Sequence, residues 1–211
     1  MRKNLIIFRQ QYYFVYVLSI NNSIFNHVFC NKVSKLPTFN NIMMINYQNR
    51  GMFLESIINK TIAYYDCHDW AIFHKKSLPI KFTGVEKNKM KLQTAWISAK
   101  STVDYYGVYQ GHFVAFEVKN TNTHRFYLKN IKEHQSNYLK KVIKHHGISF
   151  YLIGFEKINR YFIINADLVH NWLKKSFNIE DAITNGYELK IIFPGILHFL
   201  PTIELMIKKC P

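Results

Sequence analysis

Residues 104–119 read Asp-Tyr-Tyr-Gly-Val-Tyr-Gln-Gly-His-Phe-Val-Ala-Phe-Glu-Val-Lys. The pattern predicts a β-hairpin that carries one Asp on its first strand and Glu-x-Lys on its second. A two-residue turn at Gln110-Gly111 places Asp104 directly opposite Glu117, with Cβ atoms roughly 4.5–5.5 Å apart. Lys119 lies two residues beyond Glu117 and therefore shares its face. Two carboxylates this close repel each other unless a cation lies between them, so the stretch predicts a metal site.

Two alternatives stay open at this point. Gln-Gly is not the preferred Asn-Gly turn, and a bulge that shifts the register by one residue would break the direct opposition of the carboxylates. The Glu-x-Lys pair could also be a structural salt bridge at the edge of a sheet. Alternating apolar residues on the second strand favour a central strand instead, where an unpaired ion costs several kcal/mol. Thr102, two residues before Asp104, would share the polar face and could add a hydroxyl ligand.

Composition limits the class of protein. The 211 residues are 48% hydrophobic and 16% aromatic, which argues against global disorder, and the formal net charge of +15 suggests a polyanionic partner such as nucleic acid or an anionic membrane. No run of 18 apolar residues predicts a membrane-spanning helix. The three cysteines are scattered, which excludes a disulfide framework or a thiolate zinc site and favours a reducing compartment. We therefore expect a cytoplasmic protein.

Periodicity predicts an α/β fold with a mixed central β-sheet flanked by helices. A helix is expected over residues 130–146, with Asn130 and Glu133 as a capping box and Gln135 on the face that meets the sheet. The continuous apolar run 148–155 is typical of a central strand covered on both faces. The remaining elements are expected as a helix at 51–65, strands at 70–74 and 161–165, a helix at 166–174 and a short helix from 178 that stops at Gly186.

Two segments differ from this core. Residues 1–42 carry five basic residues and no acidic one, and we expect a poorly structured extension, either a misassigned start or a basic arm that touches nucleic acid. Residues 77–100 combine many lysines with aromatic residues, and 80–83 and 94–97 could be two strands. This segment is either a protruding ribbon that follows phosphates and stacks bases or a solvated mobile loop. The main domain is expected to span residues 43–211.

Several motifs, in order and with nearly matched spacing, resemble the RecU family of Holliday-junction resolvases from about residue 44 to at least residue 193. They are Asn49-Arg50-Gly51-Met52, Leu54-Glu55, His74-Lys75-Lys76, Ser101-Thr102-Val103-Asp104-Tyr105-Tyr106-Gly107-Val108-Tyr109, Phe116-Glu117-Val118-Lys119, Leu128-Lys129-Asn130 and Glu133-His134-Gln135.

The resemblance implies a PD-(D/E)xK restriction-endonuclease-like core, a homodimer and the use of Mg2+. It implies that residues 77–100 form the family's protruding stalk within a nuclease domain at 43–211. The family's pattern has Pro where this chain has Val103, the segment between Glu117 and Gln135 is about one residue short, and residues 1–42 have no counterpart. The residue roles implied by the resemblance are magnesium binding by Thr102, Asp104, Glu117 and Gln135, transition-state stabilisation by Lys119, and an accompanying helix carboxylate in Glu55.

The function that we predict is a magnesium-dependent, structure-selective endodeoxyribonuclease that resolves Holliday junctions by paired symmetric nicks in homologous recombination and DNA repair. Its partners would be four-way junction DNA, a second copy of the chain and a recombinase, with no membrane. One alternative is another nuclease of the same fold. A second is a non-catalytic junction-binding protein that modulates a recombinase, and a third is a basic RNA- or ribosome-associated protein.

Overall fold

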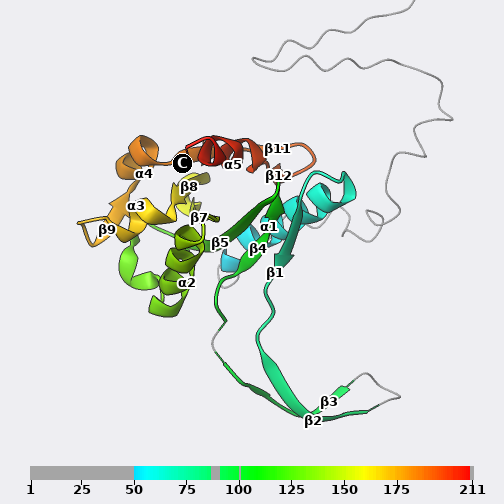
Figure 1. The fold of residues 1–211 in the computed structure, drawn as a ribbon. Helices are drawn as coiled ribbons and strands as arrows, with labels where there is room; N and C mark the ends of the chain where they lie inside the picture. The colour runs from blue at the N-terminus through cyan, green and yellow to red at the C-terminus, as the bar shows by residue number, and fades with distance from the viewer. Residues whose placement is uncertain (1–49, 87–90, 100, 210–211) are drawn as a thin grey trace, which may run out of the picture. The chain divides into compact units, whose positions relative to one another are not determined.

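The computed structural model describes residues 50–86, 91–99 and 101–209, so the expectations for residues 1–42 lie outside the described residues. Its centre is a six-stranded sheet of order β1-β4-β5-β7-β8-β10, in which β5 and β7 are parallel and the other neighbours antiparallel (Figure 1). The mixed α/β sheet flanked by helices is confirmed. The strands are β1 Ile72–Lys75, β2 Ile80–Glu86, β3 Lys91–Ile97, β4 Tyr105–Tyr109, β5 His112–Thr121, β6 Arg125–Tyr127, β7 Ile148–Phe155, β8 Arg160–Asn165, β9 Ser176–Asn178, β10 Tyr187–Leu189, β11 Ile191–Ile192 and β12 Ile196–Leu197. The helices are α1 Arg50–Cys67, α2 Glu133–Lys144, α3 Ala166–His170, α4 Ile179–Asn185 and α5 Leu200–Ile207, with one-turn 3-10 helices η4 Leu128–Asn130 and η5 Glu156–Ile158.

The sheet separates two apolar cores because alternate residues of each strand point to opposite faces. On one face, Phe116 stacks between Tyr105 and Phe150, at ring-centroid distances of 5.0 and 4.8 Å, and α1 packs over them. On the other face, Ala115 and Tyr151 belong to the core that α2 covers. Glu117 lies on this second face, between the sheet and α2.

The hairpin has the predicted register. Tyr105 pairs with Phe116 and Tyr109 with His112, so Gln110 and Gly111 form the two-residue turn. Both turn residues have positive φ, 48° and 78°, as a type I′ turn requires. The register places Asp104, the residue before β4, at the level of Glu117, and the alternative with a slipped register is wrong.

The second hairpin strand is central, as predicted. β5 is hydrogen-bonded to β4 on one side and to β7 on the other, and every residue of β7 is buried. On the far side of β4, a Cβ on Gly107 would lie 2.0 Å from the carbonyl oxygen of Ile72. A glycine therefore lets β1 approach β4 closely, which brings the end of β1 beside Asp104, where the Lys76 amide donates to the Asp104 carbonyl at 2.8 Å.

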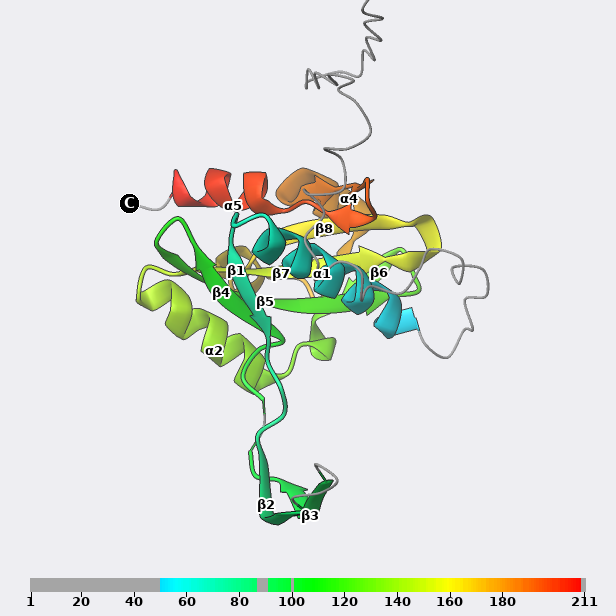
Figure 2. The ribbon, with the colours of Figure 1, turned by 90° about the vertical axis from the view of Figure 1, so that its right-hand side faces the viewer.

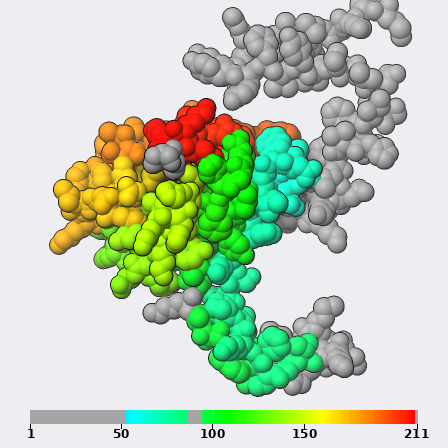
Figure 3. All heavy atoms as spheres, in the orientation of Figure 1, coloured from blue at the N-terminus to red at the C-terminus, as the bar shows by residue number. Residues whose placement is uncertain are grey.

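A separate two-stranded ribbon projects from the domain. β2 and β3 pair with each other, with Ile80 opposite Ile97, and not with the main sheet. Figures 2 and 3 show this ribbon extending away from the sheet and its helices. It leaves the sheet after β1 and returns just before Asp104, so its base adjoins the polar end of the hairpin.

Two helix boundaries differ from prediction. α2 begins at Glu133 with Lys132 as its N-cap, and the predicted capping box at Asn130 is wrong because residues 128–130 form their own 3-10 turn. α3 ends at His170, not Lys174, where the Asn171 side chain bonds back to the Asp167 carbonyl and the chain turns into β9. None of the helices in the described ranges is long and apolar enough to span a membrane.

Candidate active site

Asp104 and Glu117 hold each other's strands through reciprocal hydrogen bonds. The Asp104 amide donates to Glu117 Oε1 at 3.0 Å, and the Val118 amide donates to Asp104 Oδ2 at 3.1 Å. Each carboxylate is therefore fixed by the backbone of the opposite strand. Asp104 and Glu117 therefore lie opposite each other, as predicted, and hydrogen bonds hold both side chains in place.

Lys119 Nζ lies where three oxygen-bearing side chains converge. It donates to Glu117 Oε2 at 2.8 Å and to Gln135 Oε1 at 3.2 Å, and it lies 4.0 Å from Asp104 Oδ2. Gln135 reaches the cluster from the first turn of α2 and is buried, as predicted. Four of the six predicted site residues are thus brought together.

Burial dominates the electrostatics of Glu117. Its side chain is 0% exposed, and this desolvation, with the neighbouring Asp104 carboxylate, raises the pKa of Glu117 to about 8, while Lys119 acts in the opposite direction. Two carboxylates cannot both remain charged here without nearby positive charge. The site therefore favours binding a cation.

The other two predicted residues lie differently. The Thr102 hydroxyl is buried and has no hydrogen-bond partner within the described part of the chain, so an oxygen ligand is left over near the Asp104 strand. Glu55, on α1, forms an ion pair with Lys75. Among the described contacts, no hydrogen bond or ion pair joins Glu55 to the cluster, and α1 packs on the opposite face of the sheet.

Two residues that lie against predicted site residues were not themselves predicted. Lys75, at the end of β1, neutralises Glu55, and only the β1–β4 pairing reveals that it lies level with Tyr105. Tyr151 on β7 is the register partner of Glu117, and burial together with the Glu117 charge raises the pKa of Tyr151 to about 12. A tyrosine within an otherwise apolar strand was the available signal for Tyr151.

The donor set fits a hard cation. In the described residues there is no group of three or more His, Cys, Asp or Glu side chains that could hold a metal ion. Carboxylate, amide and hydroxyl oxygens are the ligands that Mg2+ and Ca2+ prefer. The carboxylates of Asp104 and Glu117 and the amide of Gln135 converge on Lys119 Nζ.

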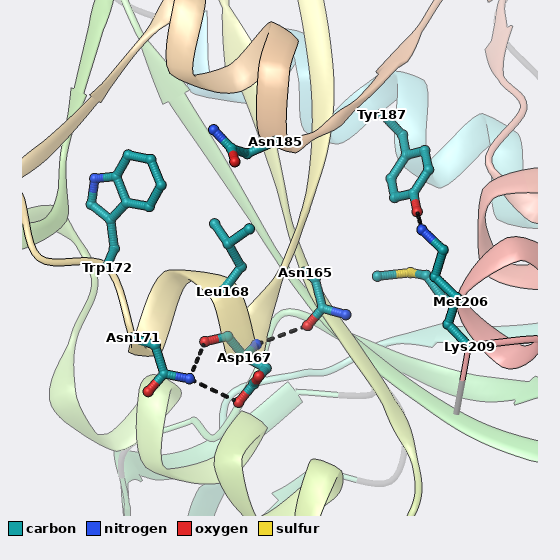
Figure 4. Close-up of a pocket in the computed structure, with 9 residues that line it drawn as sticks. All are labelled: Asn165, Asp167, Leu168, Asn171, Trp172, Asn185, Tyr187, Met206 and Lys209. Carbon is teal, nitrogen blue, oxygen red and sulfur yellow. Dashed lines mark hydrogen bonds between the residues drawn. The ribbon is translucent and has the colours of Figure 1, made fainter. Parts of the chain in front are cut away.

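A hollow of about 530 Å3 lies elsewhere, between α3, α4 and α5 (Figure 4). Its polar groups are largely bonded to one another. Asn171 donates to the Asp167 carboxylate, Asn165 accepts from the Asp167 amide, and Lys209 donates to the Tyr187 hydroxyl. With a single carboxylate and no paired acid and base, this hollow lacks the groups for hydrolysis.

A mixed sheet whose central hairpin carries Asp on one strand and Glu-x-Lys on the next is the core of a PD-(D/E)xK nuclease, here with Val103 before the Asp. Comparison with known proteins specifies the family. The family model described as Recombination protein U (RecU) matches residues 49–205, and the chain belongs to the RecU family.

Curated relatives agree with this assignment. The chain is 41% identical over 162 residues to the Holliday junction resolvase RecU of Mycoplasmopsis pulmonis, an alignment that covers 77% of this chain and 98% of that protein. It is 36% identical over 168 residues to the protein of the same name from Lactobacillus acidophilus, covering 76% and 80%. A solved structure of the Holliday junction resolvase Hjc from Archaeoglobus fulgidus superposes with a TM-score of 0.41 at 9% identity, covering 64% of this chain and 94% of that one.

Proposed function

We propose that this protein is a magnesium-dependent endodeoxyribonuclease that resolves four-way DNA junctions by paired symmetric nicks, and that it acts in recombination and repair in the cytoplasm. The observation that carries the proposal is the convergence of Asp104, Glu117 and Gln135 on Lys119 Nζ between two strands and α2. The names of the relatives, Holliday junction resolvase RecU, supply the substrate class.

Mg2+ would be held by Asp104 and Glu117, with Gln135 and Thr102 as further oxygen donors. When bound, it supplies a Lewis acid and an activated water for phosphodiester hydrolysis. The buried and unbonded Thr102 hydroxyl and the raised pKa of Glu117 both support the fit, because each is relieved by a cation. Glu55, paired with Lys75 on the other face, is proposed as an accompanying carboxylate outside this set.

The chain's own residues would divide the remaining tasks. The reciprocal amide bonds hold both carboxylates in place before substrate arrives, so little reorganisation is needed during the reaction. Lys119, which now bridges Glu117 and Gln135, would turn its ammonium toward the scissile phosphate and stabilise the charge that develops on a phosphoryl oxygen. Val118 and Phe116 behind the site belong to the apolar core and restrict access of water from that side.

Nicking of a synthetic four-way junction tests this proposal. With Mg2+, the full chain should introduce symmetric nicks into strands of like polarity, and EDTA should abolish them. A linear duplex of the same arm sequence serves as the control substrate. Equal nicking rates on the junction and the duplex would favour another nuclease of the same fold, whereas binding of the junction without any nicking would favour a non-catalytic junction-binding protein.

Paired nicks need two active sites, and we propose that a second copy of the chain supplies the other. β1 is an edge strand, and three exposed apolar side chains lie in a row across β1, β4 and β5. Ile72 faces Val108, which faces Phe113, and the three are 57%, 47% and 38% exposed. Such a contiguous apolar row on exposed strands is typical of an interface.

Replacing Ile72 by Lys should shift the protein from dimer to monomer, because a charge on the edge strand of this row would be buried in the interface without a partner. Sedimentation velocity measures the change directly. Leu173→Lys is the matched control, since Leu173 is fully exposed outside the row and its replacement should leave the dimer intact. A dimer that persists in Ile72→Lys would place the interface elsewhere.

A further inference from the structure

The chain between Lys119 and Gln135, two residues of the candidate active site, carries several lysine and arginine side chains. After β5, the chain runs through β6, η4 and the N-cap of α2, and β6 pairs with β9. Residues 120–132 and 171–178 contain no Asp or Glu, whereas they hold five lysine or arginine side chains. We call these two segments the basic ribbon.

The basic ribbon is rigid. Phe126 and Phe177 are fully buried and directly opposite each other across its two strands. The Thr121 and Thr123 hydroxyls both donate to the Arg125 carbonyl, at 2.9 and 2.7 Å. A further bond from the Leu128 amide to the Lys175 carbonyl, at 3.1 Å, ties η4 to β9. The backbone that carries these lysines is therefore held in place before a partner binds.

Two of the five cations lie near the same carboxylate, Asp181, and one of them is paired with it. Lys174 forms an ion pair with Asp181 at 2.8 Å, and Arg125 helps to lower the pKa of the same Asp181 carboxyl. Lys129, Lys132 and Lys175 are exposed, and none of the ion pairs found in the described residues involves them. Lys129 Nζ lies 5.6 Å from the centroid of the Tyr127 ring, a cation–π contact that orients the ammonium without cancelling its charge.

We propose that Lys129, Lys132 and Lys175 bind backbone phosphates of the duplex arm whose strand enters the site at Lys119. The longer segment adjoins residues of the candidate active site at both ends, because it directly follows Lys119 and because the Gln135 amide bonds to the Lys132 carbonyl. Exposed lysines that form no ion pair within the described residues are suited to contacts with backbone phosphates, and such contacts carry no sequence preference. This inference rests on the proposed function, since it assigns a surface to the same DNA substrate.

The test is the salt dependence of binding to a four-way junction and to a linear duplex, measured without divalent metal so that neither is cut. Each lysine that contacts a phosphate contributes about 0.9 to the slope of log affinity against log salt concentration. For the variant Lys129→Ala/Lys132→Ala/Lys175→Ala, the magnitude of this slope should therefore be smaller by about 2 to 3 on both DNAs. In nicking assays with Mg2+, this triple variant should change KM more than kcat.

A control variant with the same net charge distinguishes the loss of specific phosphate contacts from a general loss of positive charge. Lys60→Ala/Lys190→Ala/Lys208→Ala removes the same number of charges from outside the ribbon and should keep the wild-type slope. An unchanged slope in the ribbon variant, or an equal loss in the control, would overturn the proposal. A loss on the junction alone would also overturn it, because the ribbon would then bind the branch point and not an arm. If the wild-type protein fails to nick, the proposed function fails while the slopes still report on the ribbon.

Discussion

Replacing Asp104 by Ala should reduce Mg2+-dependent nicking of a four-way junction by at least about a thousandfold while leaving junction binding intact. The proposed metal loses one of its two carboxylates, and several kcal/mol of transition-state stabilisation are lost with it, at about 1.4 kcal/mol for each factor of ten. The Asp104 side chain is partly exposed, accepts from the Val118 amide at the strand end and lies 4.0 Å from Lys119 Nζ, so the fold should survive. Single-turnover nicking and a parallel binding titration measure the two effects separately.

Two variants make this result specific. Asp104→Asn keeps an oxygen for the Val118 amide but lacks the charge, and it should be nearly as inactive as Asp104→Ala. Glu188→Ala removes an exposed carboxylate of β10, whose partner is Arg160, and should nick like the wild type. Nicking by Asp104→Ala within about tenfold of wild type would show that the metal site has been assigned to the wrong residues.

The hairpin is the part of the fold that the sequence predicts best, because residues close together in the chain determine its turn and its register. A two-residue turn with a glycine and the two-residue period of a strand fix which side chains face each other, and the observed register agrees. Gln135 was equally accessible, since its helical spacing from Leu139 and Val142 places it on the buried face of α2. The continuous apolar run of residues 148–155 predicted a central strand covered on both faces, and every residue of β7 is buried.

What the sequence could not reveal depends on contacts between distant segments. The position of Glu55 is an example. Its spacing on α1 is compatible with a site residue, but α1 packs on the far face of the sheet and Lys75 from β1 engages the carboxylate. The false capping box at Asn130 has a similar origin, because η4 is held by a bond from the Leu128 amide to the carbonyl of Lys175, the residue before β9. No pattern of neighbouring residues indicates that β6 pairs with β9. The basic ribbon, which depends on this pairing, therefore could not be predicted from the sequence.

Replacing Lys119 by Met should slow nicking by about a hundred- to a thousandfold, the usual cost of removing one preorganised electrostatic group from a transition state. Loss of its ion pair also leaves Glu117 buried without a positive partner, so thermal unfolding must be followed alongside activity. Lys119→Arg should recover stability but only part of the rate, since a guanidinium places its charge differently. In Glu117→Gln/Lys119→Met, the buried charge is gone, and stability should return while nicking stays absent. A folded Lys119→Met protein that nicks at the wild-type rate would reduce Lys119 to a structural partner of Glu117.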